Sequence, residues 1–182
     1  MSQIENLYTP NCIRTFTGKY VNVFDPAPEM ICIEDIAHAL ANQCRFGGHL
    51  KEFFSVADHS LNCCMYINDQ TQALSALMHD ASEAYLLDIP KPIKGGLTNY
   101  KEIEDNLMVL IAEKFQFQYP LSKEVKEVDS IMLNYEWETL MLGHKSYEIV
   151  KRNNPKDSFI EMFNYITNAL SPHAWKDVAA VM

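Results

Sequence analysis

Apolar residues recur every three or four positions through most of this 182-residue sequence, and that spacing predicts amphipathic helices. One apolar stripe runs from Ile33 to Cys44. A second helix should begin at Ser55, which stands three residues before Asp58 as in a capping box. Further helices are expected over about 71–86, around 103–111, from about 122 and over about 158–170. We therefore expect an all-α fold.

Residues 13–24, IRTFTGKYVNVF, contain a Thr-Gly turn between two β-prone runs, which predicts a short N-terminal β-hairpin. No linker, repeat or low-complexity tract divides the sequence, and its length suits one domain of roughly 100–200 residues. The expected architecture is a single-domain helical bundle that spans residues 1–182.

Charge and composition exclude several classes of function. The net charge of −9 disfavours nucleic-acid binding, which depends on basic residues that neutralise phosphates. No apolar run approaches the roughly 18–20 residues of a membrane span, and the start MSQIENLYTP does not look like a signal peptide. The five cysteines show no Cys-x-x-Cys spacing. We therefore expect a cytoplasmic protein with reduced thiols, acting neither on membranes nor on nucleic acid.

The segment ALMHDASEAYLLDIPKPIK is the most informative stretch, because polar groups interrupt an otherwise apolar helix. A buried carboxylate must be paired, hydrogen-bonded or bound to metal, since burying it unpaired costs several kcal/mol. The adjacent His79 and Asp80 would supply one nitrogen and one oxygen ligand. Two residues cannot complete a metal site, so other helices must contribute.

Two candidates for the missing ligands lie elsewhere in the sequence. His59, in SVADHS, is one helix earlier, and the short connection favours antiparallel packing of the two helices. Asp129 lies beside the apolar stripe of the fifth expected helix. Taken alone, either residue is more often a surface or core residue than a ligand. The ordered set in a helical chain favours the metal-site interpretation.

The order His59, His79-Asp80, Asp129 resembles the metal-binding signature of the HD superfamily of phosphohydrolases. The segments IEDIAHALANQCRFGGH, SVADHS and HDASEAYLLDIPKPIK are similar to the bacterial 5′-deoxynucleotidase branch and its phage-encoded relatives. The resemblance covers roughly residues 14–142. It implies an HD-type helical bundle that holds one divalent cation, with manganese, cobalt or magnesium favoured and iron, nickel or zinc as alternatives.

The resemblance also implies roles for other residues. Glu83 would serve the attacking water together with the metal ligand Asp80, and its spacing from the His79-Asp80 pair would place it on the same helical face. Arg45 would bind the phosphate, with Phe46 beside the sugar. Simpler alternatives are a solvated Glu83 and an Arg45 that only ends a helix. By the same resemblance Asp88 would lie near the sugar hydroxyls, with a turn residue before a proline as the simpler alternative. Weaker candidates for substrate contact are His49, Lys91 and Lys94.

The expected reaction is metal-dependent hydrolysis of a nucleotide phosphate, converting a (deoxy)nucleoside 5′-monophosphate to nucleoside and phosphate. One alternative is a deoxynucleoside triphosphate triphosphohydrolase, because the same ligands would serve both reactions. A second is a metal-binding nucleotide sensor or scaffold without turnover. Phe46 stands where relatives often carry tryptophan, which leaves the sugar selectivity open. A homodimer is expected from the relatives.

Overall fold

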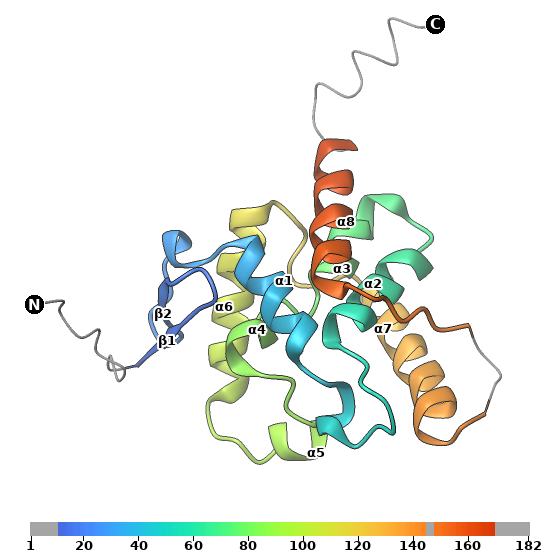
Figure 1. Cartoon of the computed structure of the whole chain (residues 1–182). Helices are drawn as coiled ribbons and strands as arrows, with labels where there is room; N and C mark the ends of the chain where they lie inside the picture. Colours follow the sequence, from blue (N-terminus) through green and yellow to red (C-terminus); the bar gives the residue numbers. More distant parts are fainter. Residues whose placement is uncertain (1–10, 145–147, 170–182) are drawn as a thin grey trace, which may run out of the picture.

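The computed structural model describes residues 11–144 and 148–169, which are mostly helical with one short β-hairpin (Figure 1). The predicted helical class and the hairpin are confirmed. The helices are α1 (Ile33–Asn42), α2 (Val56–Tyr66), α3 (Ala73–Leu77), α4 (Glu83–Leu86), α5 (Lys91–Lys94), α6 (Tyr100–Phe115), α7 (Lys123–Glu136) and α8 (Pro155–Ala169).

The hairpin pairs β1 (Cys12–Arg14) with β2 (Tyr20–Asn22) in antiparallel fashion. Its connection contains Gly18 at a φ of +88°, a conformation that glycine adopts without steric cost. Thr17 donates hydrogen bonds from its backbone nitrogen and its hydroxyl to the Asp35 carboxylate, at 2.7 and 2.8 Å. These bonds tie the hairpin to the first turn of α1.

Helix α2 lies at the centre of the helical packing and contacts α1, α3, α7 and α8 (Figure 1). Every residue from Val56 to Cys64 is buried. The sequence predicts one small buriable face for this helix, and the structure buries all of its sides because helices surround it. A site residue on α2 therefore lies within reach of several other elements.

The predicted capping box at the start of α2 is confirmed. Ser55 Oγ accepts a hydrogen bond from the backbone nitrogen of Asp58 at 3.0 Å, and Asp58 Oδ2 accepts one from the backbone nitrogen of Ser55 at 3.3 Å. The two bonds satisfy amides that the first turn of a helix leaves without partners. They fix the start of the central helix in a fully buried position.

We expect Ser55→Ala to lower the free energy of unfolding by about 1–2 kcal/mol, the usual effect of losing a buried N-cap. Urea unfolding would measure the change. Ser122→Ala is the matched control: Ser122 caps α7 through a longer 3.3 Å bond from Val125, a residue that cannot return the bond. A loss at Ser55 no larger than the loss at Ser122 would contradict the importance of the capping box.

The expectation of one continuous helix over about 71–86 is wrong. Helix α3 ends at Leu77, residues 78–82 form tight turns, and α4 begins at Glu83. In the turns the backbone nitrogen of Ala81 donates to Met78 O and that of Glu83 donates to Asp80 O, at 3.0 and 2.9 Å. The helical pattern of apolar residues continues across the break, which is why the sequence did not indicate it.

Helix α7 begins after Ser122, near the predicted start, and passes directly into one π-helical turn, Trp137–Met141. Helix α8 packs its buried Phe159 and Ile166 into the core near α1, α2 and α3. No helix in the described residues combines the length and the apolar character that crossing a membrane requires.

Candidate functional site

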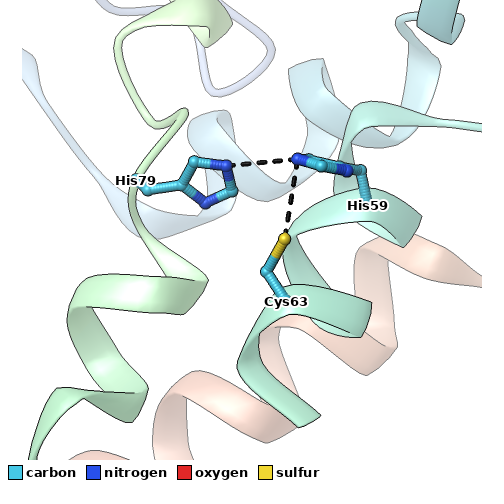
Figure 2. A group of neighbouring side chains, drawn as sticks. All are labelled: His59, Cys63 and His79. Carbon is cyan, nitrogen blue, oxygen red and sulfur yellow. Dashed lines mark hydrogen bonds between the residues drawn. The ribbon is translucent and has the colours of Figure 1, made fainter. Parts of the chain in front are cut away.

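Two buried histidines, His59 of α2 and His79 of the 78–82 turn, approach each other at the centre of the site (Figure 2). His59 Nδ1 lies 2.6 Å from Glu136 Oε1, and His79 Nδ1 lies 2.7 Å from the carbonyl oxygen of Ala76. Both oxygens accept hydrogen bonds, so each Nδ1 is the donor. In the neutral rings the two Nε2 atoms, 3.2 Å apart, therefore direct lone pairs toward each other.

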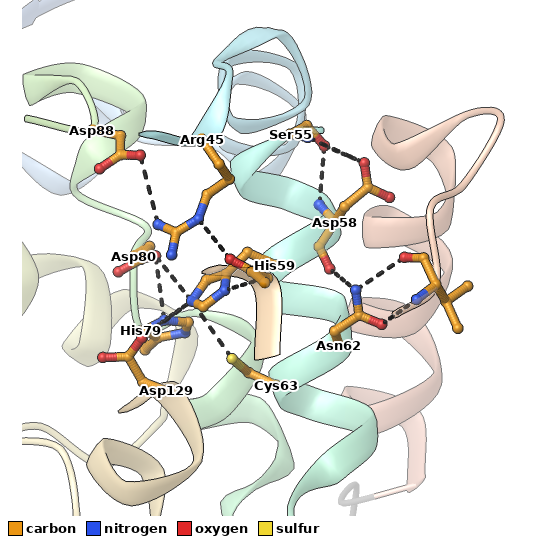
Figure 3. Close-up of polar contacts among 12 residues, drawn as sticks. Arg45, Ser55, Asp58, His59, Asn62, Cys63, His79, Asp80, Asp88 and Asp129 are labelled. Carbon is orange, nitrogen blue, oxygen red and sulfur yellow. Dashed lines mark hydrogen bonds and ion pairs between the residues drawn. The ribbon is translucent and has the colours of Figure 1, made fainter. Parts of the chain in front are cut away.

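The carboxylates of Asp80 and Asp129 lie close to the two Nε2 atoms (Figure 3). Asp80 Oδ2 lies 3.2 Å from His79 Nε2 and 3.8 Å from His59 Nε2. Asp129 Oδ1, from α7, lies 3.2 Å from His59 Nε2 and 3.7 Å from His79 Nε2. Donor atoms about 2.0–2.2 Å from one first-row ion are about 2.8–3.6 Å from each other. Three of these five spacings, at 3.2 Å, fall in this range, and the other two, at 3.7 and 3.8 Å, are longer.

The electrostatics of the cluster favour positive charge at its centre. Although burial opposes the charged ring, Asp80 and Asp129 raise the pKa of His79 well above its ordinary value. Burial likewise opposes the charged carboxyl of Asp80, yet the two histidines lower its pKa. Four converging lone pairs would repel one another without a proton or a metal ion between them. A proton or a metal ion at this point would relieve the repulsion.

The helix break after Leu77 explains how neighbours in sequence reach the same point. Adjacent side chains in a regular α-helix point about 100° apart, but His79 and Asp80 lie in the turn and converge. Glu83 does not share a helical face with them, contrary to the prediction from its spacing, because α4 begins only at Glu83. The turn nevertheless brings Glu83 to the same cavity.

Cys63 is a neighbour of the cluster that the sequence analysis missed. It lies one turn after His59 on α2, and its Sγ atom is 3.6 Å from His59 Nε2 (Figure 2). Ligand atoms of His59, Cys63 and His79 all lie within 4.8 Å of one another, so this buried group could bind a metal. Its i, i+4 spacing from His59 was the available signal.

Glu136, the last residue of α7, is fully buried and was also missed. Its Oε1 accepts from His59 Nδ1, and its Oε2 accepts from Arg45 Nε at 3.2 Å. One carboxylate thus orients a candidate metal ligand and an arginine together. Partners of this kind fix the tautomer and direction of a ligating histidine.

A cavity of about 780 Å³ opens beside the cluster, within the roughly 300–1,000 Å³ typical of small-molecule sites. His59 and His79 are buried and are not among its lining residues. The structure brings the other predicted site residues together along the lining: Arg45, Phe46, His49, Asp80, Glu83, Asp88, Lys91, Lys94 and Asp129.

Arg45 lies in the 3-10 turn Arg45–Gly48, beyond the end of α1, and is buried. Besides its bond to Glu136, it places Nη1 3.6 Å from Asp88 Oδ2 (Figure 3). The Nη2 atom of Arg45 takes part in neither of these two contacts. The two carboxylates hold the guanidinium in a fixed orientation at the cavity wall. An arginine that only interacts with the end of a helix would not need two such partners.

Glu83 is buried at the start of α4 and lines the cavity. Lys94 Nζ lies 3.0 Å from Glu83 Oε1 and 2.8 Å from Glu104 Oε1. Burial, aided by the nearby charge of Asp80, raises the pKa of Glu83 to about 8. A carboxylate with such a pKa can accept and return a proton near neutral pH.

Gln43 braces the segment between Glu83 and Asp88. Its Nε2 donates to the carbonyl oxygen of Glu83, and its Oε1 accepts from the backbone nitrogen of Asp88, both at 2.9 Å. The braced segment includes Leu87, whose φ of +70° is unfavourable for a branched side chain. Such conformations persist where the surroundings enforce them, often at functional sites.

The remaining candidates differ in how the structure holds them. His49 and Lys91 are exposed residues of the lining, and Phe46 is half-buried. Phe46 adopts a left-handed φ of +55°, with its ring centroid 5.9 Å from that of Trp137. Trp137 lines the cavity and was not predicted to do so.

No family model matches the chain. The uncharacterized Escherichia coli K12 protein YfdR is 42% identical over 154 residues, which covers 85% of this chain and 84% of YfdR. An uncharacterized Rhodobacter capsulatus protein is 31% identical over 141 residues, covering 70% of this chain and 71% of that protein.

Proposed function

The chain belongs to the same family as YfdR of Escherichia coli, and we propose that it is an HD-type, metal-dependent phosphohydrolase acting on nucleotide phosphates. The preferred substrate is a (deoxy)nucleoside 5′-monophosphate, which it hydrolyses to nucleoside and phosphate. This proposal combines the resemblance of the sequence to the HD superfamily with the geometry of the cavity.

The convergence of two imidazole nitrogens and two carboxylate oxygens at one wall of the cavity carries the proposal. His59, His79, Asp80 and Asp129 would hold one divalent cation, with manganese, cobalt and magnesium as the first candidates. When bound, such a cation supplies positive charge that offsets the charge developing on a phosphate oxygen during hydrolysis.

The residues around the cluster have distinct tasks in this reaction. Arg45 binds phosphate oxygens, and its orientation is fixed by Glu136 and Asp88 before the substrate arrives. Glu83 accepts a proton from the attacking water, for which its raised pKa suits it. Lys94, paired with Glu83, holds that carboxylate in place.

The charge of the lining supports a monophosphate over a triphosphate. Four carboxylates line the cavity, from Asp80, Glu83, Asp88 and Asp129. Two of its cations, Arg45 and Lys94, are already paired with carboxylates. A triphosphate would bring more negative charge to these carboxylates than a monophosphate does, and like charges at close range repel strongly.

A release assay across nucleoside mono-, di- and triphosphates, with Mn²⁺, Co²⁺ and Mg²⁺ tested separately, examines the proposal. We expect inorganic phosphate from monophosphates with at least one of these ions. Release of intact triphosphate without action on monophosphates would instead indicate the triphosphohydrolase. Nucleotide binding without any product would indicate a sensor.

We expect Arg45→Lys to lower kcat/KM for a deoxynucleoside monophosphate about ten- to a hundredfold, because lysine keeps the charge but loses the planar fork. Because Arg45 makes buried contacts with Glu136 and Asp88, the melting temperature should fall as well. Steady-state kinetics measured well below that temperature separate the two effects.

Arg152→Lys is the matched control for Arg45→Lys. Arg152 lies 3.8 Å from the buried Asp58 carboxylate and does not line the cavity. We expect this variant to retain kcat/KM. Wild-type kcat/KM in Arg45→Lys would remove Arg45 from the phosphate site.

A further inference from the structure

One wall of the cavity is aromatic and apolar, in contrast to the charged end around Asp80. Phe46, Leu133, Trp137 and Met141 form this aromatic wall. The rings of Phe46 and Trp137 lie 5.9 Å apart, tilted by 52°. Trp137 is 44% exposed, a large fraction for a tryptophan that lines a cavity. An exposed aromatic surface at such a place can stack against a planar ligand.

The aromatic wall and the metal cluster are joined by a single helix. Asp129, Leu133 and Trp137 follow one another at four-residue spacing, and all three line the cavity. At about 1.5 Å of rise per residue, Trp137 lies about 12 Å along the helix axis from Asp129. A molecule with its phosphate at the cluster would reach Trp137 only with a part beyond the sugar.

The backbone near each aromatic residue departs from regular structure. Trp137 begins the π-helical turn, where the backbone nitrogen of Leu142 donates to Trp137 O at 3.1 Å. Phe46, in its left-handed conformation, directly follows Arg45, whose guanidinium carbon lies 5.6 Å from the Phe46 ring. Both departures are of the kind that concentrates at functional sites.

From this arrangement we infer that Phe46 and Trp137 form a binding subsite for the base of the nucleotide, with Trp137 as its stacking surface. The inference rests on the proposed function, and it assigns the apolar end of the cavity to the part of the substrate that does not react. Stacking is tolerant of base identity, because every base presents a π-face. The subsite thus selects nucleotides over sugar phosphates and discriminates weakly among bases.

The test compares a deoxynucleoside 5′-monophosphate with deoxyribose 5-phosphate, which keeps the sugar and the phosphate but lacks the base. The ratio of their kcat/KM values should fall about tenfold or more in Trp137→Ala, as expected for loss of one stacked aromatic ring. Trp137→Phe should keep most of that ratio, because phenylalanine retains a stacking face. An unchanged ratio in Trp137→Ala would overturn the inference.

A binding measurement tests the subsite without turnover. The chain has two tryptophans, so in a Trp175→Phe variant the fluorescence reports on Trp137 alone. Saturable quenching by the nucleoside monophosphate, with no response to inorganic phosphate, supports the subsite. Absence of quenching by nucleotide at any concentration overturns it. If the wild-type protein hydrolyses neither substrate, the proposed function fails, while the fluorescence still decides whether Trp137 binds a base.

Discussion

Asp80→Ala should abolish both metal binding and hydrolysis. The substitution removes a carboxylate whose oxygen lies 3.2 Å from His79 Nε2 at the centre of the cluster. Loss of an outer partner of a metal ligand typically costs about 10–100-fold in metal affinity or activity. We expect loss of the ligand itself to exceed that range. Elemental analysis of the purified protein and the phosphate release assay measure the two effects.

Asp88→Asn is the matched control for the metal content of Asp80→Ala. Asp88 also lines the cavity, but its carboxylate faces Arg45 at 3.6 Å and is not one of the four converging ligands. The control should retain its metal. Unchanged metal stoichiometry in Asp80→Ala would exclude Asp80 as an essential ligand.

Glu83→Gln should lower kcat by about 100-fold or more while the metal content stays at the wild-type level, since a positioned general base contributes about 10²–10⁴-fold. Glutamine keeps the shape of the side chain but cannot accept the proton. Steady-state kinetics with elemental analysis on the same preparation separate catalysis from metal binding.

Glu104→Gln is the control for the loss of an ion pair with Lys94, which Glu83 and Glu104 share. Lys94 pairs with both Glu83 and Glu104, but Glu104 belongs to α6 and does not line the cavity. A smaller loss in Glu104→Gln than in Glu83→Gln assigns the catalytic effect to the Glu83 carboxylate itself. A kcat for Glu83→Gln within about threefold of wild type would rule out its role as general base.

Elements set by short-range interactions could be predicted from the sequence. Ser55 bonds to Asp58 and Ser122 bonds to Val125, in each case three residues further along the chain. The starts of α2 and α7 are therefore determined by local sequence. The hairpin could be predicted for the same reason, because its turn needs little more than Gly18 in a permissive conformation.

The helix break at residues 78–82 could not be predicted in this way. The apolar spacing continues across it, and the segment that follows the turn is held by contacts from elsewhere in the fold. Gln43 bonds to the carbonyl of Glu83 and to the amide of Asp88 over about forty residues of sequence. A local pattern carries no information about partners at that separation.

Glu136 is a different case, because the sequence did contain a signal. It continues the stripe of buried positions on α7 formed by Val125, Val128 and Met132. A glutamate at such a position requires partners, by the same argument that identified Asp80. The identity of those partners, His59 and Arg45, could come only from the structure.

Glu136 lies between the two halves of the proposed site. Its two oxygens bond to His59 and to Arg45, so one buried carboxylate contacts both a proposed metal ligand and the proposed phosphate-binding residue. Coupling between binding events is reciprocal. If a cation bound at His59 raises the affinity of Arg45 for phosphate by some factor, phosphate bound at Arg45 raises the affinity of the cluster for the cation by the same factor. Metal and substrate would then bind cooperatively, and the substrate-free protein would be the form that releases its ion most readily.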